Sequence, residues 1–150
     1  MSIVELTWPY IDRSIESLVR LFEDLDVSGR TWTPPAPDAN SVAALVNHTV
    51  SNAEDNLLGT VAGTAVAYER QADFDRPEAE PARVRARWHA VRDAFVRRIP
   101  DLDDAAVLER VSHPRRGEVT RYEAMLVVAR HAAEHLAHAE LTRDLYRAAH

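Results

Sequence analysis

Two of the seven histidines in the chain stand four residues apart, at His131 and His135. Residues at positions i and i+4 of a helix project from the same face, about one turn apart, so both imidazoles can reach a single ion. Neutral imidazole nitrogens bind divalent metals such as zinc at about 2.0–2.1 Å. His138 follows three residues later and lies near the same face. This spacing predicts a metal site on one helix, with a further ligand supplied from another part of the chain.

The same segment contains HAAEH, which fits the H-x-x-E-H pattern of inverzincin peptidases with Glu134 as the general base. Those enzymes take a further ligand from well downstream, and only 15 residues follow His135. We therefore interpret Glu134 as a helix-surface residue or a neighbour of the metal ligands, and we do not expect a peptidase.

Three histidines elsewhere in the chain can be compared as sources of the third ligand. His89 follows Trp88, which has a core-like position, so His89 is expected to face outward; His113 lies in an irregular stretch. His48 lies inside a predicted helix, on a side that changes from apolar to polar. The polar residues on that side are Thr49, Asn52 and Asp55. A lone histidine there is most often a core residue, but a facing pair of histidines favours His48 as a ligand.

Apolar residues at three- and four-residue intervals predict the helices that must position these side chains. The predicted helices cover about residues 9–26, 42–68, 82–99 and 120–150. Asn40 or Ser41 is suited to cap the second helix, whose later turns are weakened by Gly59 and Gly63. Between the third and fourth helices, Val111 and Val119 flank a Pro- and Gly-containing turn, which allows a short β-hairpin.

Four helices without repeats or a series of strands predict an all-α four-helix bundle, formed as a single domain over residues 1–150. The connections of roughly 10 to 20 residues are longer than those of simple up-down bundles. They leave the topology open and are long enough to cover one end of the bundle.

The composition excludes several classes of function. The formal charge is −6, with 24 acidic residues against 18 basic residues that are all arginine, and an acidic domain is a poor nucleic-acid binder. No run of about 18 apolar residues predicts a membrane-spanning helix, and no signal peptide is recognisable. Cysteine is absent, which suits a reducing compartment, so we expect a cytoplasmic protein. Arginine without lysine, together with abundant alanine, indicates a GC-rich bacterial source.

Two segments resemble the DinB-like superfamily. WTPPAPDANSVAALVNH, residues 32–48, is similar to the segment in which a Trp-Pro loop leads through Asn-Ser into a helix carrying a metal-ligand histidine. HAAEHLAHAELTRDLY, residues 131–146, is similar to the final helix of that family, with its paired histidines. The resemblance extends over nearly the whole chain and includes the four-helix plan.

The resemblance implies an open three-histidine site for a divalent metal ion, and it selects His48 as the third ligand. The ligands that it implies are His48, His131 and His135. His138 stands where relatives carry Gln or His, so we expect it, with Asn52 and Asp55, to lie behind the ligands or to act as an alternate ligand. Three imidazoles with open positions suit zinc, nickel or iron and are typical of a catalytic site.

The superfamily is similar to thiol-dependent enzymes, because mycothiol-dependent maleylpyruvate isomerase and the bacillithiol or mycothiol S-transferases share the bundle. The resemblance therefore implies a thiol-dependent S-transferase or isomerase that uses a low-molecular-weight thiol, such as mycothiol, and an electrophilic substrate. Residues that could hold the charged parts of these molecules are Arg121, Arg130 and Arg143.

Two other functions remain open at this point. A metal-dependent hydrolase would need a general base, for which Asp55 and Glu134 are weak choices; a non-enzymatic metal-binding or stress-related module needs none. We also expect a homodimer, since relatives are often dimeric. Trp8, Tyr10 and Trp32 either lie in such a contact or pack within the core and loops.

Overall fold

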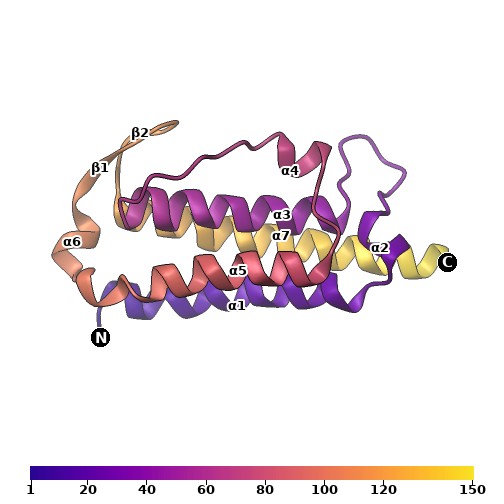
Figure 1. Cartoon of the computed structure of the whole chain (residues 1–150), viewed down its shortest axis with the longest axis horizontal. Helices are drawn as coiled ribbons and strands as arrows, with labels where there is room; N and C mark the ends of the chain where they lie inside the picture. Colours follow the sequence, from indigo (N-terminus) through magenta and orange to yellow (C-terminus); the bar gives the residue numbers. More distant parts are fainter.

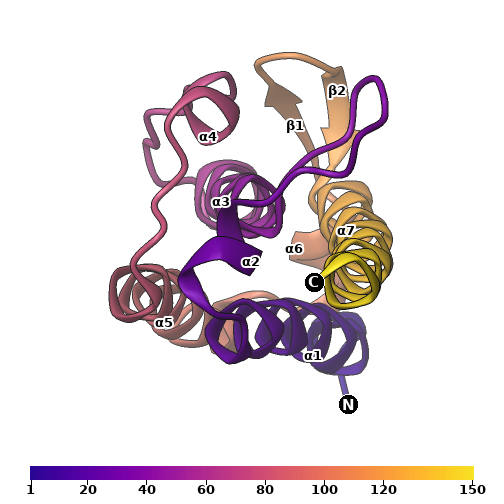
Figure 2. The ribbon, with the colours of Figure 1, turned by 90° about the vertical axis from the view of Figure 1, so that its right-hand side faces the viewer.

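The structure, a computed structural model, describes residues 1–150 and contains four long helices that pack side by side (Figure 1). These helices are α1 (Ile3–Asp24), α3 (Val42–Ala53), α5 (Pro81–Val96) and α7 (Arg121–Ala149). Viewed along their axes, the four helices surround one core (Figure 2). The predicted all-α four-helix bundle is therefore confirmed. None of the helices is sufficiently long and apolar to cross a membrane.

The connections carry short elements of their own. They are α2 (Val27–Thr31), the π-helical η1 (Glu54–Val61), α4 (Ala72–Asp75), the 3-10 turn η2 (Ile99–Asp101), α6 (Asp104–Leu108), β1 (Arg110–His113) and β2 (Gly117–Thr120). The two strands pair antiparallel, with Val111 opposite Val119, which confirms the predicted hairpin before the last helix. The stretch between η1 and α4 runs back along α3 (Figure 1).

Local capping interactions fix where the helices begin. At the start of α7, the Thr120 hydroxyl accepts a hydrogen bond from the Glu123 N–H, and the Glu123 carboxylate accepts one from the Thr120 N–H. The same reciprocal box joins Ser2 and Glu5 at the start of α1. Such boxes satisfy backbone donors that have no partner within the helix. Ser41 caps α3, as predicted, by accepting from the Ala44 N–H.

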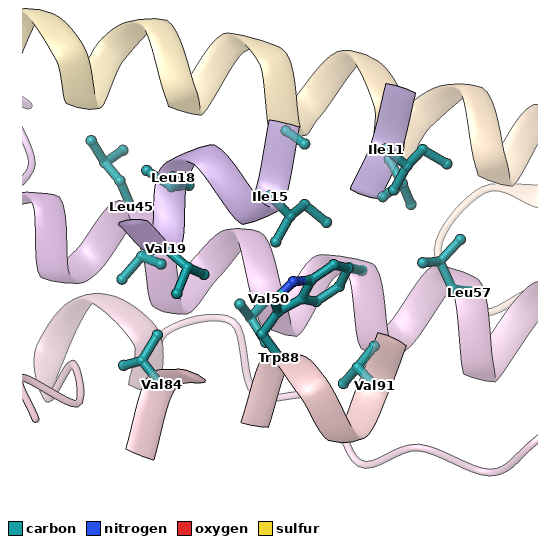
Figure 3. Close-up of a cluster of buried hydrophobic side chains, with 14 of the residues drawn as sticks. Ile11, Ile15, Leu18, Val19, Leu45, Val50, Leu57, Val84, Trp88 and Val91 are labelled. Atoms are coloured by element: carbon teal, nitrogen blue, oxygen red, sulfur yellow. The ribbon is translucent and has the colours of Figure 1, made fainter. Parts of the chain in front are cut away.

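The core is built around Trp88, whose side chain is fully buried among aliphatic residues of α1, α3 and α5 (Figure 3). The Trp8 ring lies 6.3 Å from that of Trp88, so Trp8 is a core residue. Trp32 packs against the Tyr146 ring at 5.8 Å. Of the three aromatic residues considered for a dimer contact, only Tyr10 is exposed, with 72% of its surface accessible.

Every residue of α3 is buried, including His48 and the other polar ones. The helix is covered by the other long helices on one side and by the returning chain and α4 on the other (Figure 2). A buried helix with polar residues needs partners for those residues. The polar side of α3 is therefore the place where long-range polar contacts must form.

Three predicted helix boundaries are wrong. α1 begins at Ile3 rather than at Pro9, because the capping box starts the helix earlier and Pro9 is accommodated inside it. The second helix ends at Val61 rather than near Tyr68, after its last turns become π-helical. In that segment the Asn56 side-chain amide donates to the Asn52 carbonyl oxygen, and the Ala62 N–H donates to the Leu57 carbonyl oxygen five residues back. The third helix ends at Val96 rather than near Ile99, where a 3-10 turn begins.

Candidate metal centre

The structure brings together His48 of α3 and His131 and His135 of α7. The Nε2 atom of His131 lies 3.0 Å from Nε2 of His48 and 3.0 Å from Nε2 of His135. One ligand atom from each residue falls within 4.8 Å of the other two. A neutral imidazole nitrogen offers one N–H or one lone pair, so His131 cannot hydrogen-bond well to both neighbours. A cation would use the lone pairs of all three nitrogens, and the donor set therefore fits a divalent metal ion.

The environment of these histidines favours the neutral form that binds metals. Burial, together with the neighbouring His135 and His48, lowers the pKa of His131 to about 3. Burial, with the nearby His48 and His138, lowers the pKa of His135 to about 4. Metal ions bind deprotonated ligands, so at neutral pH no proton has to leave these two imidazoles before binding.

Asp73 of α4 lies behind His48, in the connection between the second and third predicted helices. The Asp73 Oδ2 atom is 3.6 Å from the His48 Nδ1 atom, and both atoms are buried without a hydrogen-bond partner. The Ser51 hydroxyl donates to Asp73 Oδ1 at 2.8 Å. Metal-ligating histidines commonly direct their second nitrogen to a carboxylate, which orients the ring and raises its basicity. Asp73 is placed to do this for His48.

No local pattern in the sequence marks Asp73, because its contact with His48 depends on the path of the chain after η1. That stretch returns along α3 and places α4 beside the middle of the helix (Figure 1). Phe74, the neighbour of Asp73, packs on the His48 ring with 4.8 Å between ring centroids. α4 thus fixes the ring of His48 from its outer side.

A pocket of about 280 Å³ opens beside His48 and His131. The other residues that line it are Asn52, Tyr68, Arg70, Arg115 and Arg116. They come from α3, from the stretch after η1, and from the turn of the hairpin. Both α4 and the hairpin stand on the side of α3 and α7 away from α1 and α5 (Figure 2). Two of the three histidines, His48 and His131, therefore face a pocket whose far walls are formed by connections rather than by the bundle.

The residues expected close to the ligands occupy different positions. Asn52 lines the pocket, and its Oδ1 atom is buried without a hydrogen-bond partner. The Asp55 carboxylate forms an ion pair with the Arg115 guanidinium. His138 is half-buried and lies outside the cluster of three. Their assignment as residues behind the ligands, or as alternate ligands, stays a prediction.

The arginines expected to bind substrate lie outside this pocket. Arg121 pairs with Glu109, and Arg143, which is 28% exposed, pairs with Asp144. Arg130 is 69% exposed and lies beside Glu134. Their role in substrate binding stays a prediction. The pocket contains three other arginines, Arg70, Arg115 and Arg116. Arg115 and Arg116 are adjacent in the turn of the predicted hairpin. The Pro and Gly residues of this turn predicted a hairpin, but no feature of its sequence predicted that the turn would lie beside the histidines.

The two alternatives to His48 are placed elsewhere. His89 is exposed on α5, with its Nε2 atom 3.5 Å from Nη1 of Arg85. His113 is buried in the hairpin, where its Nδ1 atom accepts a hydrogen bond from the Arg115 N–H at 3.1 Å. Neither belongs to the three-histidine cluster.

Known proteins resemble this chain in both sequence and fold. The family model described as "DinB superfamily" matches residues 10–139. A solved structure, "Crystal structure of the conserved protein of locus from Enterococcus faecalis", is similar with a TM-score of 0.77 and 16% sequence identity, covering 97% of each chain. At this identity the likeness shows the fold alone. No curated protein matches the sequence. Since the family match spans most of the residues, and the bundle and its histidines accord with it, the chain belongs to the DinB superfamily.

Proposed function

We propose that this protein binds a divalent metal ion, zinc, nickel or iron, at His48, His131 and His135 and acts as a thiol-dependent S-transferase or isomerase. The observation that carries the proposal is the convergence of three imidazole nitrogens beside a polar pocket. Three protein ligands leave coordination positions for a small molecule, as in catalytic metal sites. The partners would be a low-molecular-weight thiol, such as mycothiol, and an electrophilic substrate.

The residues around the site have separable roles in this proposal. When bound, a divalent ion lowers the pKa of a coordinated thiol and so favours the thiolate nucleophile at neutral pH. Asp73 holds the His48 ring in the orientation that directs its Nε2 atom to the other imidazoles. The pocket arginines and Asn52 offer polar groups to the molecule that enters.

Neither carboxylate considered as a general base for hydrolysis is free of an arginine partner. A hydrolase needs a free carboxylate or another base beside the attacking water. Asp55 is engaged by Arg115, and Glu134 is exposed next to Arg130. A bound divalent ion lowers the pKa of coordinated water as well as that of a thiol, so the thiol assay below decides between the two reactions.

The first experiment measures metal binding. Metal-free protein is titrated with Zn²⁺, Ni²⁺ and Fe²⁺ under reducing conditions, alongside His48→Ala and His131→Ala. His89→Ala is the matched control, because His89 is exposed on α5 away from the cluster. We expect one equivalent of metal in the unchanged protein and in His89→Ala. Each of His48→Ala and His131→Ala should weaken metal binding by at least about 100-fold. Equal affinity in all four proteins would overturn the site.

The second experiment tests the reaction. Metal-loaded protein is incubated with mycothiol or bacillithiol and a fluorogenic electrophile, and formation of the thioether is followed. We expect turnover that requires the metal and is lost in His131→Ala. If the metal binds but no thiol is turned over or shifts the melting temperature, the thiol proposal is wrong and a metal-binding module is the remaining function.

A further inference from the structure

The pocket beside the histidines carries uncompensated positive charge. Of its three arginines, only Arg115 has a carboxylate partner, that of Asp55. The Arg70 guanidinium lies 4.9 Å from the centroid of the Phe74 ring and forms no ion pair. The Arg116 guanidinium approaches only the Asn56 side-chain oxygen, at 3.5 Å. Two of the three guanidiniums on the pocket walls, those of Arg70 and Arg116, therefore have no carboxylate partner.

Arg115, which adjoins Arg116, is held in place by contacts with η1 and the stretch that follows it. Arg115 sits between the Asp55 carboxylate and the face of the Tyr68 ring, 4.7 Å from its centroid. The Arg115 N–H also donates to His113, which fixes the hairpin turn. A group positioned in advance loses less freedom when it binds a ligand.

The balance of charge indicates which ligands the pocket accepts. Partial burial, together with the neighbouring Arg115, lowers the pKa of Arg116, so a bound anion would stabilise its charged form. A planar guanidinium presents paired N–H donors that match the two oxygens of a carboxylate or a phosphate. The Oδ1 atom of Asn52, buried without a partner, adds an acceptor for an N–H or O–H of the same molecule.

We propose that this pocket is an anion-binding subsite, in which Arg70 and Arg116 bind a carboxylate or phosphate group of the small molecule that reacts at the three histidines. The reaction part of this statement rests on the function proposed above, whereas the binding part does not. The pocket, at about 280 Å³, lies just below the usual range for drug-sized ligands, so the molecule is small. An uncharged compound would leave both guanidiniums without a partner.

The test uses metal-free full-length protein and two probes, inorganic phosphate and succinate, titrated at low ionic strength by calorimetry. The variants are Arg70→Gln, Arg116→Gln and the double variant. Arg110→Gln is the matched control, because Arg110 is exposed on the same hairpin and bonds only the Glu118 carbonyl oxygen. We expect each pocket variant to weaken binding about 10-fold or more, the double variant to abolish it, and the control to match the unchanged protein.

The relative affinity for the two probes distinguishes a phosphate from a carboxylate ligand. Arg116→Lys keeps the charge but not the paired donors, so intermediate binding supports the guanidinium geometry. Circular dichroism of each variant checks that the bundle is intact. Absence of saturable binding to the unchanged protein, or unchanged binding in the double variant, would overturn the subsite.

Metal titrations on the same samples separate this inference from the proposed function. If anions bind in an arginine-dependent way but no metal binds at the histidines, the proposed function fails and the subsite stands. If the double arginine variant binds metal and turns over thiol as the unchanged protein does, and neither probe binds, the subsite fails and the proposed function stands.

Discussion

Replacement of Asp73 tests whether the carboxylate behind His48 contributes to metal affinity. The Asp73 and His48 side chains are 10% and 6% exposed, so little water is available to replace their contact. Loss of such a partner behind a metal ligand typically weakens metal binding 10- to 100-fold, or about 1.4–2.8 kcal/mol. Asp73→Asn keeps the size and an acceptor but removes the charge, so we expect metal binding to weaken about 10-fold. Asp73→Ala removes both, so we expect a loss near the upper limit.

Competition with a chromophoric chelator measures these affinities directly. Asp75→Asn is the matched control, since Asp75 lies on the same short helix, is exposed, and accepts a hydrogen bond only from Gln71. Ser51→Ala, which removes the donor to Asp73, should give a smaller loss than Asp73→Asn. Spectra of the cobalt-substituted protein add a second readout, because a reoriented His48 ring changes the ligand field of the metal.

The reasoning is refuted if Asp73→Asn and Asp73→Ala bind metal within twofold of the unchanged protein while the metal-free forms stay folded. An equal loss in Asp75→Asn would also refute it, because the effect would then come from general charge rather than from contact with His48. Thermal unfolding of each metal-free variant excludes a simple loss of structure.

Four further predictions concern stability, pH dependence and assembly. Trp88→Ala should cost about 3–5 kcal/mol in urea unfolding, because Trp88 is fully buried in the core. In metal-free protein, unfolded histidines take up protons near pH 6.5, whereas folded His131 and His135 do so near pH 3 and 4. The free energy of unfolding should therefore fall as the pH drops from about 6.5 towards 3. The fall should be smaller in a variant that carries both His131→Ala and His135→Ala. Gly29→Ala should cost about 1–3 kcal/mol by the same assay, because its Cβ would lie 2.7 Å from Cε1 of Tyr146. The expected homodimer should sediment at twice the 16.9 kDa of the chain, and a monomer at micromolar concentration would contradict it.

Local patterns in the sequence account for the bundle, the hairpin and the histidine pair. Apolar spacing along each segment reports which face is buried, and the four-residue interval between His131 and His135 places both on one face of α7. The turn that contains Pro114 and Gly117 marks the hairpin. These features depend on neighbours within a few residues, so the chain shows them directly. The resemblance to a known family added His48 as the partner of that pair.

Only the tertiary structure decides the surroundings of the histidines. The contact of Asp73 with His48 depends on a chain that turns back along α3. The pocket arginines come from two connections, the stretch after η1 and the turn of the hairpin. Such contacts join residues far apart in the chain, and periodicity carries no information about them. The sequence by itself therefore determined the helices and the paired ligands, while packing decided what orients those ligands and what charge they face.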